Sequence, residues 1–167
     1  MRTETGYVPQ EVFLFSDTIA NNIAFTSGKI VPGRDAIIQA AKDAVIHSNI
    51  IEFPENYETM VGERGVTLSG GQKQRISIAR AIIKNPKILV FDDCLSAVDT
   101  ETEEEILTNL KRVMEGRTTL IISHRISSVK AADKIIYMDE GQIKETGTHL
   151  ELVEKKGEYY SLHLKQL

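Results

Sequence analysis

The sequence predicts an α/β fold in which a three-layer core is preceded by a helical subdomain. Two nearly continuous apolar runs, 87–92 and 118–123, are typical of strands buried on both faces of a parallel sheet, and a helical pattern separates them. The region before them has a mostly helical spacing of apolar residues. We therefore expect three parts within one domain: the end of a core strand and a loop in 1–15, the helical subdomain in 16–86, and the C-terminal part of the core in 87–167.

The N-terminal region begins with a short strand and continues with helices. Residues 6–8 are strand-like, and Pro9 ends the strand because it lacks the N–H that a central ladder needs. A short helix follows, with Ser16 or Asp17 as its expected N-cap. A second, amphipathic helix is expected to be capped by Asp35.

A loop and a third helix complete the helical region. Glycine and proline residues across 54–67 predict a long, structured loop. The helical spacing resumes at Ser69. Asn85 and Pro86 end it, because the residue before a proline is disfavoured in helical conformation.

The C-terminal half alternates strands with helices. Thr100 and Glu103 are expected to form a capping-box pair at the start of the helix between the two apolar strands. The segments 134–138 and 142–145 flank an Asp-Glu-Gly turn and predict a β-hairpin. The remaining tail is expected to form two short helices that break near Gly157.

Composition excludes several classes of protein. The 167 residues are 41% hydrophobic and 26% charged, which is typical of a folded globular domain. A net charge of −4 argues against a chain that coats nucleic acid, because that function needs a basic excess. The single cysteine, Cys94, excludes a disulfide framework, and the apolar runs are too short to span a bilayer.

A Ser-Gly-Gly turn that leads directly into a helix is the first candidate site. Gly70 and Gly71 would let an anion approach the unpaired N–H groups at the positive end of the helix, and Ser69 would add a hydroxyl donor. This arrangement is that of a phosphate-binding helix terminus. The alternative is a glycine pair ahead of an ordinary helix cap.

Polar side chains at the ends of both predicted strands form the second candidate site. Asp92 and Asp93 place hard oxygen ligands where open α/β folds bind their substrates; one could hold Mg²⁺ and the other could orient an attacking water. Either could instead cap the following turn. His124 follows the second strand and could donate to a phosphate oxygen, although a lone histidine is also often structural.

Taken in order, these segments resemble the ATP-binding-cassette (ABC) family of ATPases, specifically the ATPase half of exporters with fused membrane domains. Residues 68–72 match the LSGGQ signature of that family letter for letter. The strand ending at Asp92 is similar to the Walker B strand, 96–99 to the D-loop and 123–125 to the switch-histidine segment. The resemblance implies a partial P-loop NTPase fold.

Two further segments strengthen the resemblance to exporters. Residues 7–10, followed by Phe-Leu-Phe at 13–15, are similar to the Q-loop. Residues 61–65 resemble a short exporter loop that touches the membrane domains. The resemblance therefore implies two partners, the transmembrane domains of the same full-length chain and a second ABC ATPase domain in a homo- or heterodimer. It implies no nucleic acid, and a location at the cytoplasmic face of the cell membrane.

The resemblance also implies ATP and Mg²⁺ as cofactors and a role for each motif residue. Asp92 and Gln10 would bind the metal, and Asp93, His124 and Gln10 would be catalytic. The implied mechanism is in-line phosphoryl transfer to water, driven by positioning and charge stabilisation. The implied cofactor-binding residues, which would complete the site of the opposing subunit, are Ser69, Gly70, Gly71, Gln72 and Asp99.

The sequence departs from the family pattern at two places. No Walker A motif accompanies the one Gly-Lys pair, Gly28-Lys29, so we expect this motif upstream of Met1 and a C-terminal fragment that is inactive alone. Asp93 stands where the family has a glutamate. Its carboxylate ends about 1 Å short, a displacement that can cost on the order of a hundredfold in rate.

The sequence is consistent with two alternatives to an active exporter domain. The shortened acid at position 93 favours a hydrolysis-impaired, nucleotide-binding regulatory subunit of a heterodimeric exporter. A relative that acts on DNA or ribosomes without transport is the second alternative. It is disfavoured because the sequence has neither long inserted arms nor basic segments.

Overall fold

The computed structural model describes residues 4–25, 32–62 and 65–167, which fold as two compact units, Met1–Ile122 and Ser123–Leu167. The Gly28-Lys29 pair and the middle of the segment 61–65 lie outside the described residues.

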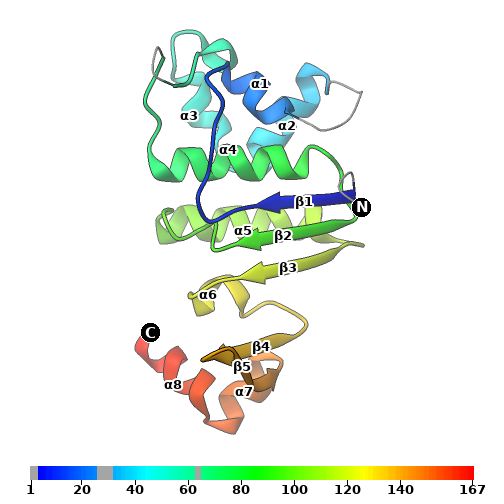
Figure 1. Cartoon of the computed structure of the whole chain (residues 1–167), viewed down its shortest axis with the longest axis vertical. Helices are drawn as coiled ribbons and strands as arrows, with labels where there is room; N and C mark the ends of the chain where they lie inside the picture. Colours follow the sequence, from blue (N-terminus) through cyan, green and yellow to red (C-terminus); the bar gives the residue numbers. More distant parts are fainter. Residues whose placement is uncertain (1–3, 26–31, 63–64) are drawn as a thin grey trace. The chain divides into compact units, whose positions relative to one another are not determined.

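The first unit contains a parallel three-stranded sheet of β1 (Thr5–Val8), β2 (Ile88–Asp92) and β3 (Thr118–Ile122), in that order (Figure 1). Gly6 pairs with Leu89 of β2, which in turn pairs with Thr119 of β3. Helices connect strands that run in the same direction. The expected α/β class with a parallel sheet is confirmed.

The two faces of this sheet differ in burial. Val8, Leu89 and Phe91 lie on the face covered by α4 and α5 and are buried. The alternate residues point the other way, and Leu120 of β3 remains 53% exposed. The expectation that both runs are buried on both faces is therefore wrong for the described residues of the first unit, because the helices of this unit cover only the face that carries Val8, Leu89 and Phe91.

The expected helical region corresponds, in the residues that the structure describes, to the helices α1 to α4 and the short 3-10 helix η2, which lie on the covered side of the sheet (Figure 1). Their bounds are α1 Ile19–Ala24, α2 Arg34–Asp43, α3 His47–Ile51, η2 Asn56–Glu58 and α4 Gly70–Ile82. Helix α4 lies between the sheet and the other helices (Figure 1). η2 falls inside the segment expected to be a structured loop.

Several expected helix starts are corrected by the structure. Helix α1 is capped by Thr18, which accepts a hydrogen bond from the Asn21 N–H, and not by Ser16 or Asp17. Helix α2 begins after Gly33, so Asp35 lies in its first turn. Serine, threonine, aspartate and glycine are all favoured at the N-cap position. Residue type alone therefore does not decide between neighbouring candidates.

Helix α5 (Thr100–Met114) is also capped differently from the expectation. The Asp99 carboxylate accepts from the Thr102 N–H at 2.9 Å, so the cap lies one residue before Thr100. Glu103, expected to face back toward the cap, is 1% exposed. Asp99 thus has a structural role at the start of α5.

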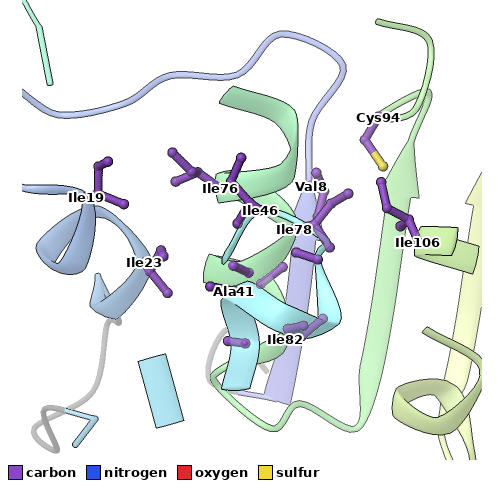
Figure 2. Close-up of a cluster of buried hydrophobic side chains, with 14 of the residues drawn as sticks. Val8, Ile19, Ile23, Ala41, Ile46, Ile76, Ile78, Ile82, Cys94 and Ile106 are labelled. Atoms are coloured by element: carbon purple, nitrogen blue, oxygen red, sulfur yellow. The ribbon is translucent and has the colours of Figure 1, made fainter. Parts of the chain in front are cut away.

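Isoleucines dominate the core of the first unit. Figure 2 shows Ile76, Ile78 and Ile82 of α4 among side chains from the surrounding helices and from β1. The cluster joins α4 to both the sheet and the helical region. It therefore fixes the helix that begins at the Ser-Gly-Gly turn.

The second unit contains a hairpin and three helices. Its strands β4 (Ile135–Asp139) and β5 (Gln142–Gly147) pair antiparallel, as expected. Helix α6 is Ile126–Val129, and the two tail helices are α7 (His149–Lys155) and α8 (Glu158–Lys165). Glu145 of β5 accepts from the Tyr159 N–H at 3.1 Å and so caps α8.

Candidate functional site

A capping box opens helix α4. The Ser69 hydroxyl accepts from the Gln72 N–H at 3.2 Å, and the Gln72 side-chain oxygen accepts from the Ser69 N–H at 2.9 Å. The N–H groups of Gly70 and Gly71 are among the first donors of the helix, which have no intrahelical partner. The predicted phosphate-binding residues thus form a helix terminus with outward donors at its positive end.

The turn 96–99 lies directly against this terminus. A Cβ added to Gly71 would be 3.0 Å from the Ala97 carbonyl oxygen. Gln74, one turn further along α4 and buried, accepts from the Ala97 N–H at 3.2 Å. The segments 68–72 and 96–99 therefore pack directly against each other. Sequence reasoning missed the role of Gln74, which only its burial reveals.

The two aspartates end β2 in different backbone conformations. Asp92 is the last strand residue, whereas Asp93 has φ 44°, a left-handed conformation that aspartate tolerates better than most side chains. The Asp93 N–H donates to the Ile122 carbonyl at 2.8 Å, and its carbonyl accepts from the Ser96 hydroxyl at 2.9 Å. The Asp93 carboxylate takes no part in these two backbone bonds, which hold the main chain of the turn.

One donor from the segment 7–10 reaches each aspartate. The Gln10 Nε2 is 3.5 Å from Asp93 Oδ2, a long contact between two residues predicted to be catalytic. The Tyr7 hydroxyl donates to Asp92 Oδ2 at 2.9 Å. This bond raises the pKa of the Tyr7 phenol. Tyr7 was not predicted as a site residue, because no local pattern reveals the register between β1 and β2.

The side-chain groups at the end of β2 suit Mg²⁺, which keeps water and phosphate ligands, better than they suit a metal ion bound only by protein side chains. Among the described residues, no group of three or more His, Cys, Asp and Glu side chains could hold a metal ion. Mg²⁺ usually takes one or two carboxylates and completes its shell with water and substrate phosphates. Asp92, Asp93 and the Gln10 amide match that pattern.

The remaining predicted site residues are Asp99 and His124. The N–H of Thr102 lowers the pKa of the Asp99 carboxyl, which caps α5 beside the Ala97 turn. His124 belongs to the second unit, where its carbonyl accepts from the Gln166 side chain at 2.8 Å. Within the first unit, the structure thus brings together Gln10 with Asp93, and the signature segment with the D-loop.

Phe13 and Phe15, which precede α1, and Phe25, which follows it, form an aromatic surface. The rings of Phe13 and Phe15 are 5.2 Å apart, and those of Phe15 and Phe25 are 4.4 Å apart. All three side chains are exposed, and the exposed fraction of Phe13 is 68%. Arg80 of α4 donates to the Phe13 carbonyl at 2.9 Å and so ties this surface to the signature helix.

The segment predicted to touch membrane domains lies beside the same part of the chain. The Val61 N–H donates to the Asp17 carbonyl at 3.0 Å, and Thr18 forms a bridge with Met60. A Cβ on Gly62, which has φ 117°, would be 2.6 Å from the Ser16 hydroxyl. The aromatic surface and the described part of 61–65 therefore adjoin one stretch, residues 13–18.

These features are those that the resemblance to the ABC family predicts. The sequence profile described as ABC transporter matches residues 1–96, and the chain belongs to this family. No helix in the described residues has the length and apolar character needed to cross a bilayer.

The chain is similar to several proteins named as ABC transporters. It is 53% identical over 98% of its length to an uncharacterized ABC transporter ATP-binding protein, YknU, of Bacillus subtilis. It is 47% identical over 99% of its length to an ATP-dependent lipid A-core flippase of Syntrophus aciditrophicus. It spans 28% and 27% of the lengths of these two relatives.

A solved structure agrees with these sequence similarities. The chain matches the structure of a bacterial Atm1-family ABC exporter with ATP bound, with a TM-score of 0.91 and 45% identity. The match covers 99% of this chain and 29% of the exporter chain. The described fold is therefore that of the matched part of this exporter chain.

Proposed function

We propose that this chain is the ATPase part of an exporter in which ATP is bound and hydrolysed between two such domains, driving transport by membrane-spanning partners. The observation that carries this proposal is the open terminus of α4 packed against the turn at Ala97. The family resemblance assigns both segments to the dimer interface, and here they pack against each other. The similarity to exporters supports the part of the proposal that concerns transport.

The proposed division of labour follows from the chemistry of each group. Ser69, Gly71 and Gln72 on α4 would bind the γ-phosphate of a nucleotide held by the second domain, because outward N–H groups at a helix start attract anions. Asp92 and Gln10 would hold Mg²⁺, which would supply charge neutralisation at the phosphate oxygens.

Three further residues would act at or near the reacting phosphate. Asp93 would accept a hydrogen bond from the attacking water, and its contact with Gln10 would hold that carboxylate in place. His124 would donate to the γ-phosphate. Asp99 would lie at the interface, where its bond to Thr102 keeps it oriented.

The aromatic surface of Phe13, Phe15 and Phe25 is the proposed contact with the membrane domains. Exposed aromatic rings clustered on one side of a domain are typical of a protein–protein interface. Arg80 of α4 contacts this surface, so a displacement of the aromatic rings would be transmitted to α4. The domain would then work at the cytoplasmic face of the cell membrane.

The experiment uses the full-length protein reconstituted in lipid vesicles. Gly71→Val would press a branched side chain against the Ala97 carbonyl oxygen, 3.0 Å from the added Cβ, and so displace the turn 96–99 from the helix terminus. We expect roughly a hundredfold loss of ATP hydrolysis from that displacement. Gly33→Val is the matched control, because a Cβ at Gly33 meets nothing within 4 Å among the residues that the structure describes. Undiminished hydrolysis and unaltered dimer formation by Gly71→Val would contradict the proposal.

A hydrolysis-impaired regulatory subunit is the second candidate, favoured by the shortened acid at position 93. In the full-length protein, Asp93→Glu would extend the carboxylate toward the water. A rise in turnover of about tenfold or more would identify an impaired site. Unchanged turnover would show that Asp93 already serves or that another step limits the rate.

A further inference from the structure

The Tyr7 side chain lies on the open face of the sheet, next to the carboxylate that ends β2. Tyr7 pairs with Val90, and alternation along β2 places Asp92 on the same face as Val90. A residue two positions beyond the paired one is within reach of an aromatic side chain. The hydroxyl accordingly meets Asp92 Oδ2 at 2.9 Å.

The bond from Tyr7 orients the carboxylate without changing its charge. A phenol donates its one proton and adds no positive charge, whereas a lysine or arginine would compete with a metal ion for the carboxylate. Within 4–25, 32–62 and 65–167, Oδ1 of Asp92 accepts no hydrogen bond. One oxygen is therefore held by the protein, and the other remains for a ligand.

Tyr7 and Gln10 differ in how firmly they are held. Tyr7 belongs to β1, whose ladder with β2 includes the pairs on both sides of it, Gly6 with Leu89 and Val8 with Phe91. Gln10 follows Pro9 outside the strand, and its contact with Asp93 is long at 3.5 Å. The segment thus supplies a fixed donor to one acid and an adjustable donor to the other.

We propose that Tyr7 is a positioning residue that holds Asp92 in the orientation needed to bind the divalent cation of a metal–nucleotide substrate. This inference rests on the proposed function, which assigns the cation to Asp92. Groups that hydrogen-bond a metal ligand fix its direction, and losing them weakens metal binding without removing a ligand. Tyr7 contributes through the carboxylate and does not contact the reacting phosphate.

The test measures metal affinity directly. Mn²⁺ serves as a spectroscopic probe, and its binding to the full-length protein is followed by electron paramagnetic resonance in the presence of a non-hydrolysable ATP analogue. Tyr7→Phe removes only the hydroxyl, and we expect Mn²⁺ affinity to fall about three- to tenfold, as for the loss of one hydrogen bond. Affinity for the analogue without metal should be unchanged.

Two further variants separate the explanations. Tyr57→Phe removes a buried tyrosine hydroxyl that bonds His47 at 2.8 Å elsewhere in the same unit, so it controls for a general loss of stability. It should leave Mn²⁺ affinity unchanged. Asp92→Asn tests the metal assignment itself and should weaken Mn²⁺ binding more than Tyr7→Phe does.

Each outcome decides one point. Wild-type Mn²⁺ affinity in Tyr7→Phe, together with a loss in Asp92→Asn, overturns the positioning role alone. Equal losses in Tyr7→Phe and Tyr57→Phe also overturn it, because the effect would then be one of stability. Wild-type affinity in Asp92→Asn overturns the metal assignment of the proposed function, and the role of Tyr7 with it.

Discussion

Gly6 allows helix α4 to lie directly against strand β1, and its replacement by alanine tests that packing. A Cβ at Gly6 would be 2.8 Å from the Ala81 carbonyl oxygen, 2.9 Å from Pro86 Cγ and 3.0 Å from Leu89 Cδ2. The Ala81 carbonyl belongs to the backbone of α4 and cannot rotate away as a side chain could. Gly6→Ala therefore forces the helix and the strand apart.

The size of the effect follows from the contacts. Ordinary contact begins at 3.4 Å, so α4 and β1 would have to separate by roughly half an ångström. Overpacking of this kind in a close-packed interior costs about 1–3 kcal/mol. We expect the free energy of unfolding to fall by that amount, with little change in its dependence on urea concentration.

Urea unfolding followed by circular dichroism measures the change. Gly70→Ala is the matched control, because a Cβ there would lie 3.6 Å from the Ala97 Cβ, an ordinary contact. It should alter stability by less than about 0.5 kcal/mol. A Gly6→Ala protein as stable as the wild type would refute the close approach of α4 to β1 and the placement of the signature helix that depends on it.

Three further results are expected. Ser69→Ala removes the acceptor for the Gln72 N–H and should cost about 1 kcal/mol in urea unfolding, whereas Ser69→Thr should retain most of the stability; equal losses would contradict the capping box. Because the pKa of Asp99 is lowered in the folded state, its carboxylate stabilises the fold above the unfolded pKa, and this stabilisation is lost as pH falls through the folded pKa. The difference in unfolding free energy between the wild type and Asp99→Asn should accordingly shrink from neutral to acidic pH, and a constant difference would exclude the linkage. Burial raises the pKa of the Cys94 thiol to about 12, so iodoacetamide should modify it slowly in the native protein and rapidly in urea; equal rates would show that Cys94 is accessible.

Local signals predicted the elements that present the site. The start of α4 at Ser69 and its end before Pro86 follow from a cap and a proline, and the hairpin follows from its Asp-Glu-Gly turn. These features depend on residues within a few positions of one another, so a single sequence is enough to locate them. The cap of α2 was misplaced because Asp35 and Gly33 are both acceptable starts.

The capping box itself shows how a motif can have two roles. Ser69 and Gln72 were singled out as phosphate-binding residues, yet in this chain they bond each other's backbone. The spacing that matches the family signature is also the spacing of a capping box. The functional interpretation and the structural role therefore rest on the same two residues, and the sequence pattern alone does not separate them.

The sequence by itself determined the family, the order of the motifs and the strand end that carries Asp92 and Asp93. Each of these features depends on residues that are contiguous in the chain. Only the tertiary structure decided which of those segments touch. Tyr7 meets Asp92 across 85 positions of sequence, and Gln74 meets the Ala97 turn across 23. Such contacts are set by strand register and by the packing of distant elements, which follow from the burial of the whole core and leave no local pattern.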